Sequence, residues 1–212
     1  MDKTTLKKGL ALSESKGFTL IELLIVIGIL AILATVTLLV LNPAQMFAQA
    51  RDSQRISDLG SIKNAVGLYI STVQNPSLAS VGSCVTNYWG TEASTTGGSA
   101  DSPSNDAAKS SIGASATTSA SGTGWVPVAL TNISGGSPIS ALPLDPSGID
   151  STKASNNGQY SYHYMCSTTG MVFELTAYLE STRYQNAGSD DKTSTDGGTK
   201  NWLYEVGSAL NL

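Results

Sequence analysis

Residues 16–29 of this chain read KGFTLIELLIVIGI, and this stretch decides how the rest of the chain is organised. Phe18 to Leu41 form an apolar run of 24 residues in which Glu22 is the only charged side chain. A helix of about 20 apolar residues spans the hydrocarbon core of a bilayer. The run therefore predicts a membrane-spanning helix over residues 18–42.

The charges around this run predict its orientation. Four lysines precede it, at positions 3, 7, 8 and 16, and the next basic residue is Arg51. By the positive-inside rule the amino end is cytoplasmic and the rest of the chain lies outside. A secretory signal peptide has a shorter apolar region and a small-x-small cleavage site. Ala31 and Ala34 have the wrong spacing for such a site.

Glu22 is the feature that a plain signal anchor does not explain. A carboxylate at the centre of a membrane helix costs about 2.5–3.5 kcal/mol on insertion scales, and less near an end. One interpretation is a tolerated residue that reaches the membrane interface. The other is that Glu22 pairs with a buried cation, the α-amine that cleavage before Phe18 would create.

Residues 16–22 resemble the prepilin processing site of type IV pilins and type II secretion pseudopilins. The resemblance implies that residues 1–17 are a cytoplasmic leader and that a prepilin peptidase cuts between Gly17 and Phe18. It also implies that the same enzyme N-methylates Phe18, and that Glu22 neutralises the amino terminus of a neighbouring subunit during assembly. An assembly ATPase motor and a membrane platform are the further partners that the family implies.

Removal of this leader changes the net charge of the chain. The leader holds four lysines, Asp2 and Glu14, so the mature chain keeps 8 basic and 14 acidic side chains, a net charge of −6. A nucleic-acid surface needs clustered lysine and arginine. The acidic mature chain therefore argues against a nucleic-acid site of its own.

The sequence predicts that the helix is interrupted at Asn42-Pro43, because proline removes a helix hydrogen bond, and resumes over residues 43–75. Asn75-Pro76 ends it. The apolar positions recur at spacings of mostly three and four: Phe47, Ala50, Ile56, Leu59, Ile62, Val66, Tyr69, Ile70 and Val73. They predict an amphipathic helix that packs on the rest of the chain. The resemblance to pilins extends to about residue 75.

The other face of this second helix is charged. It carries Arg51, Asp52, Gln54, Arg55, Asp58 and Lys63. Two interpretations have equal weight. The charges form a solvated helix face, or they meet neighbouring subunits in a fibre.

Residues 76–212 predict a β-rich globular head. Within residues 91–124, 27 of 34 residues are Ser, Thr, Gly or Ala, a composition that predicts a surface loop. Alternating patterns predict strands over residues 160–166, 171–179 and 202–206. Residues 125–130 and 139–144 suit edge strands or packed loops. The predicted fold class is α+β, with a long amino-terminal helix packed on an antiparallel sheet, the pilin fold.

Cys84 and Cys166 both follow the membrane helix, in a compartment where thiols tend to oxidise. They predict one disulfide, and two buried free thiols are the alternative. Asp190, Asp191 and Asp196 lie in a polar loop whose carboxylate and hydroxyl oxygens suit calcium. Major pseudopilins have a calcium site in a carboxy-terminal loop, so the resemblance suggests calcium here; a plain polar loop is the alternative. No other cofactor is expected.

No nucleophile–base pair, paired carboxylate site or phosphate loop stands out, so we expect no enzymatic activity. The sequence favours the major pilin of a type IV pilus. Such a subunit waits as a single-pass protein of the cytoplasmic membrane and then polymerises into an extracellular homopolymer. One alternative is a pseudopilin of a type II secretion or DNA-uptake system. An alternative of another class is a monomeric surface-binding domain on a signal anchor.

Overall fold

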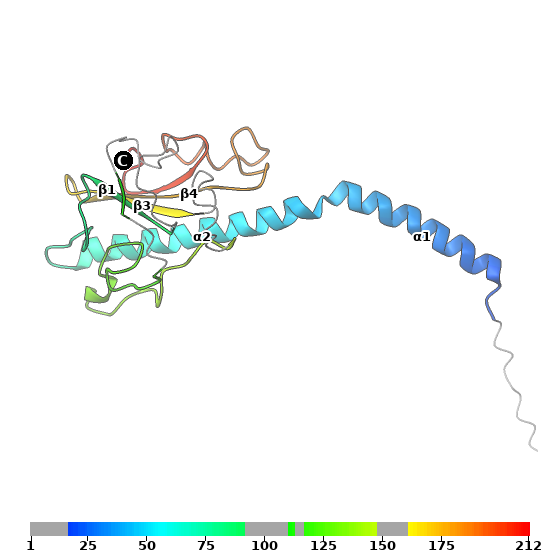
Figure 1. Ribbon diagram of the computed structural model, residues 1–212, viewed down its shortest axis with the longest axis horizontal. Helices are drawn as coiled ribbons and strands as arrows, with labels where there is room; N and C mark the ends of the chain where they lie inside the picture. Colours follow the sequence, from blue (N-terminus) through cyan, green and yellow to red (C-terminus); the bar gives the residue numbers. More distant parts are fainter. Residues whose placement is uncertain (1–16, 92–109, 113–116, 148–160) are drawn as a thin grey trace, which may run out of the picture. The chain divides into compact units, whose positions relative to one another are not determined.

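The computed structural model describes residues 17–91, 110–112, 117–147 and 161–212 (Figure 1). The predicted leader up to residue 16 and most of the predicted 91–124 loop lie outside the described residues. The chain separates into two compact units, one ending at Pro43 and the other starting at Ala44. Helix α1 (Leu20–Leu41) forms the first unit, and helix α2 (Pro43–Thr72) and the sheet form the second.

The predicted interruption between the two helices is confirmed. Helix α1 ends at Leu41, and Asn42 adopts a left-handed conformation with a φ of 38°. Asparagine tolerates this conformation better than most residues. Helix α2 begins at Pro43, whose missing N–H has no partner to lose at the first helical position.

The head contains a five-stranded sheet in the order β2-β1-β3-β4-β5. Strands β1 (Asn87–Gly90), β3 (Tyr162–Ser167), β4 (Val172–Ala177) and β5 (Tyr204–Gly207) are antiparallel, and β2 (Ser110–Ile112) is parallel to β1. The prediction of the last three strands is confirmed. The prediction that residues 91–124 form only a loop is wrong at β2, and β1 was not predicted. Residues 125–130 and 139–144 form packed loops, with a short 3₁₀ helix at Leu130–Asn132.

One face of the sheet packs on α2, as the ribbon shows (Figure 1). Tyr162 and Tyr164 of β3 and Phe173 and Leu175 of β4 are buried in the same apolar core as Leu59, Ile62, Val66 and Tyr69 of the helix. The opposite face is buried as well, since Met165, Glu174, Thr176 and Glu205 have at most 1 % of their surface exposed. The strands are therefore covered on both faces.

The buried stripe of α2 differs from the predicted one. In the second half of the helix the predicted apolar residues are buried, from Leu59 to Tyr69. In the first half, Phe47 and Ala50 are exposed, and the stripe continues through Ala48, Asp52 and Arg55. Asp58 is buried beside it. The interpretation of these charges as a solvated or intersubunit face is thus wrong for three residues, which bind the head of their own chain.

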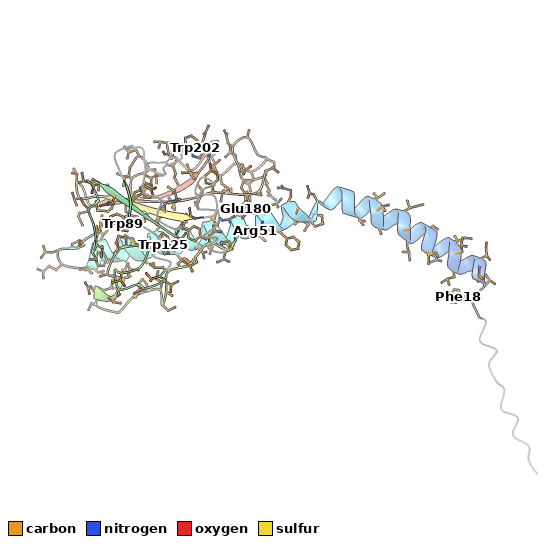
Figure 2. The ribbon with its side chains drawn as sticks, viewed as in Figure 1. Phe18, Arg51, Trp89, Trp125, Glu180 and Trp202 are labelled. Carbon is orange, nitrogen blue, oxygen red and sulfur yellow. A yellow bond between two sulfur atoms is a disulfide. The ribbon has the colours of Figure 1, made fainter. Side chains whose placement is uncertain are left out.

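Arg55 is the centre of this polar contact and is fully buried. Its guanidinium donates to both carboxylate oxygens of Asp145 at 2.7 and 2.8 Å, to Asp52 at 2.8 Å, and to Glu180. The carboxylate of Asp52 also accepts the backbone amides of Glu180 and Ser181, each at 2.8 Å. Figure 2 shows Arg51 beside Glu180, to which it donates as well. These contacts hold two head loops on the helix.

Removal of Arg55 is expected to destabilise the head strongly. Arg55→Met leaves Asp52 and Asp145 buried without their cation, which costs about 3–5 kcal/mol. Arg183→Met is the matched control, because Arg183 pairs with Asp190 at an exposed site, where a pair contributes at most about 1 kcal/mol. Urea unfolding of the full chain in detergent measures both. Equal effects of the two substitutions would contradict this account of Arg55.

Cys84 and Cys166 form the predicted disulfide, with their Cα atoms 4.9 Å apart. Both cysteines are buried in the apolar core, at the end of β3 and in the segment that leads into β1. The bond closes a loop across a sequence separation of 82 residues. In the chain-entropy model such a closure stabilises by about 4.5 kcal/mol.

The double variant Cys84→Ser/Cys166→Ser is expected to lose about 2–5 kcal/mol of unfolding free energy, because its unfolded chain is no longer restricted. Urea unfolding with and without reductant checks this. Reductant should weaken the wild type and leave the double variant unchanged. An unaltered wild type after complete reduction, verified by thiol labelling, would reject a stabilising role for the bridge.

Candidate functional site

The segment before α1 presents the predicted cleavage point openly. Gly17, Phe18 and Thr19 precede the helix, and 88 % of the surface of Phe18 is exposed (Figure 2). A Cβ atom added to Gly17 meets no heavy atom within 4 Å. The packing of the described residues therefore does not require a glycine at position 17.

Thr19 and Glu22 form a capping box at the start of α1. The Oε2 atom of Glu22 accepts the backbone amide and the hydroxyl of Thr19, each at 2.8 Å, and the Glu22 amide donates to the Thr19 hydroxyl at 3.3 Å. A cap of this kind stabilises a helix by about 0.5–2 kcal/mol. The Thr-x-x-Glu spacing before an apolar run is a sequence signal for such a cap.

The capping box gives Glu22 a role inside its own chain. The carboxylate accepts hydrogen bonds from the backbone amide and the hydroxyl of Thr19. Glu22 therefore has polar partners in its own chain and does not depend on the membrane interface for them. Both contacts from Thr19 use Oε2, and neither uses Oε1. The geometry therefore accounts for a carboxylate at this position and leaves one of its oxygen atoms outside the capping interaction.

The rest of α1 is apolar on all sides. The window from Leu20 to Thr37 has a mean hydropathy of 2.7, and none of it is buried. Among the described residues this is the one helix long and apolar enough to cross a membrane. A helix that is apolar all round has to be covered by lipid or by other protein.

Comparison with known families identifies the segment. Residues 12–38 match the family model described as the prokaryotic N-terminal methylation motif. This motif is the prepilin signature of type IV pilins and pseudopilins, and it includes most of α1, the first helix of an α+β pilin-like arrangement of two helices and a sheet. The chain thus carries the signature that its processing site predicted. Comparison with curated proteins and with solved structures finds no match.

The three predicted calcium ligands are engaged separately. Asp190 pairs with Lys192 at 2.8 Å and with Arg183 at 3.5 Å. Asp191 accepts the amides of Ala187, Thr193 and Ser194 and the Ser194 hydroxyl, and these bonds lower its pKa to about 2. Asp196 accepts the amides of Gly198 at 2.8 Å and Glu205 at 2.7 Å.

These contacts give each of the three aspartates partners within the chain. Within the part of the chain that the structure describes, no three carboxylate, histidine or cysteine side chains come close enough to hold a metal. The calcium prediction rests on residue types and on the resemblance to major pseudopilins, and it stays a prediction. Asp191 and Asp196 accept nearby backbone amides, a local role that aspartate often has in loops, and Asp190 pairs with two cationic side chains.

Proposed function

We propose that this chain is the major structural subunit of a type IV pilus, is processed after Gly17, and polymerises through α1. The observation that carries the proposal is the combination of the prepilin signature with an apolar helix that its own chain leaves uncovered. We propose no reaction of its own for the protein.

Before assembly, α1 lies in the cytoplasmic membrane. Its 22 residues correspond to about 33 Å, close to the thickness of the hydrocarbon core. The lysines that precede it keep the leader in the cytoplasm. The head, with its disulfide, then lies outside. Processing, extraction and stacking of the mature subunits are the work of the prepilin peptidase, the assembly ATPase and the membrane platform.

In the filament, neighbouring copies of α1 take the place of lipid. Apolar packing between these helices supplies the cohesion, and the heads coat the outside. Glu22 faces the Phe18 amine of a neighbour, where water is scarce and opposite charges attract strongly. The oxygen that the capping box leaves unused is the one we assign to this contact.

Cleavage after Gly17 has a direct test. Intact-mass analysis of protein sheared from the cell surface should give a first residue of Phe18, monomethylated on its amine. This result follows if the peptidase reads the Gly17-Phe18 step. Recovery of the chain from Met1, or of a chain that starts beyond Leu41, would reject the proposed processing.

Substitution of Glu22 separates its charge from its capping role. Glu22→Gln keeps a side chain that is suitable for a capping box and removes the charge. We expect it to insert and to be cleaved normally, and to give few or no filaments, because the neighbouring amine stays uncompensated at about 3–5 kcal/mol. Glu22→Ala should fail similarly, and Glu22→Asp should be intermediate because its charge is kept with a shorter reach.

Immunoblots of membrane fractions and of sheared filaments measure these variants. Thr19→Val is the matched control, since it removes the capping hydroxyl and keeps the Glu22 charge. Wild-type filament yield from Glu22→Gln would show that Glu22 only caps its helix. Short filaments confined to the cell envelope in the wild type would indicate a pseudopilin instead of a major pilin.

A further inference from the structure

Two glutamates meet on the face of the sheet that points away from α2. In the register of β4 and β5, Glu174 lies opposite Gly207 and Glu205 opposite Thr176, so the two glutamates are diagonal neighbours. Their exposed fractions are 0 % and 1 %. Two buried carboxylates side by side disfavour each other's charged form. Their presence in the core therefore requires a specific compensation.

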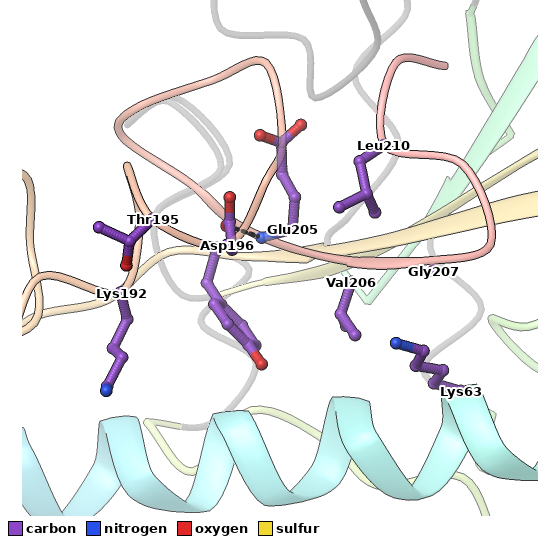
Figure 3. Close-up of a pocket in the computed structure, with 9 residues that line it drawn as sticks. Lys63, Lys192, Thr195, Asp196, Glu205, Val206, Gly207 and Leu210 are labelled. Atoms are coloured by element: carbon purple, nitrogen blue, oxygen red, sulfur yellow. Dashed lines mark hydrogen bonds between the residues drawn. The ribbon is translucent and has the colours of Figure 1, made fainter.

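Each glutamate uses one oxygen to hold a loop. The Oε2 atom of Glu174 accepts the amide of Leu212 at 2.8 Å, and the Oε2 atom of Glu205 accepts the amide of Lys200 at 2.7 Å. The Glu205 amide donates to Asp196, the contact dashed in Figure 3. The pair thus anchors the carboxy-terminal part of the head, residues 196–212, to the sheet.

The second carboxylate oxygen of each glutamate holds no loop. The Oε1 atoms of both glutamates are buried and have no hydrogen-bond partner among the described residues. The two glutamates are diagonal neighbours on one face of the sheet, a separation that long side chains can bridge. One proton between them satisfies both atoms at once, because a protonated carboxyl donates to an ionised one. A bridging water would satisfy the oxygens but would leave both charges buried.

We propose that Glu174 and Glu205 share one proton, and that this proton latches residues 196–212 to the sheet. Glu174 carries the proton and donates its O–H to the Oε1 atom of Glu205. When the proton leaves, two like charges face each other beneath the loop and the latch loosens. The shared proton involves residues of the head only, so the proposal does not depend on how the chain assembles.

The surroundings of the pair support this assignment. Burial, and then the hydrogen bond with Glu205, raise the pKa of Glu174 to about 8, while the Leu212 amide and the Lys200 ammonium oppose the rise. Further charged or titratable groups nearby include Asp196, behind the Glu205 amide, and His163 of β3, which contacts Thr176 on the same face.

The loop at Gly198 packs directly against the Glu205 carboxylate. A change in the protonation of the pair therefore alters the contacts of this loop. A Cβ atom added to Gly198 would lie 2.0 Å from Oε2 of Glu205. A pocket of about 340 Å³ lies beside the strand that carries Glu205, and Lys63 and Val206 are among the residues that line it (Figure 3). Since the folded pKa is raised from 4.5, the stabilisation is complete below about pH 4.5 and is lost as pH rises through about 8.

Thermal unfolding of the full chain in detergent with a chelator, from pH 5 to pH 9, tests the latch. Glu174→Gln cannot ionise, and its amide donates to Glu205 at every pH. From pH 5 to pH 9, the Tm of the wild type should fall by at least about 4 °C more than the Tm of Glu174→Gln. Asp190→Asn is the matched control, since this exposed carboxylate titrates below the range, and it should follow the wild type. Parallel curves for wild type and Glu174→Gln would overturn the proposal.

Two measurements on the wild type keep the test valid if the variant does not fold. Carbon-13 NMR of the glutamate carboxyls should show one group titrating near pH 8, and titration of all of them below pH 6 would overturn the shared proton. Amide exchange, corrected for intrinsic rates, should lose protection at Leu212 and Lys200 above pH 8 relative to Ser194. Unchanged protection there would overturn the latch.

Discussion

The apolar surface of α1 is the constraint on which the rest of the molecule depends. Thirteen large apolar side chains from Phe18 to Val36 are at least half exposed within the chain. Covering such a surface is favourable by an amount on the order of tens of kcal/mol, more than the total stability of a typical domain. The chain therefore needs an apolar environment for this segment. Lipid and other copies of the helix are the two environments that the proposed function supplies.

Helix α2 and the head form the second compact unit of the chain, and specific contacts join them. The buried stripe of α2 is polar where it binds the loops at Asp145 and Glu180, and apolar where it enters the core. Hydrogen bonds from Arg51, Arg55 and Ser147 outweigh the burial of Glu180 and lower its pKa to about 2. The stabilisation by this cluster is therefore present above about pH 4.5 and is lost as pH falls towards 2. The head is fastened to α2 by contacts that do not involve α1.

The sequence predicted the helices, the disulfide and three strands because each has a strong local signal: an unbroken apolar run, two cysteines, and alternating side chains. It did not predict β1 and β2, which are short and depend on their neighbours for pairing. The sequence places Asp52 and Arg55 on the charged outer face of α2, because the spacing of apolar residues does not detect buried ion pairs. The spacing of Leu59, Ile62, Val66 and Tyr69, continued backwards, leads to both. The diagonal placement of Glu174 and Glu205 depends on strand register, which no local pattern gives.

Electron cryomicroscopy of filaments sheared from cells that make this protein tests the central claim most directly. The account predicts a filament whose interior is a bundle of α1 helices, with the heads outside and each Glu22 carboxylate beside the Phe18 amine of a neighbouring subunit. A filament joined only through its heads, with α1 absent or pointing outward, would contradict it.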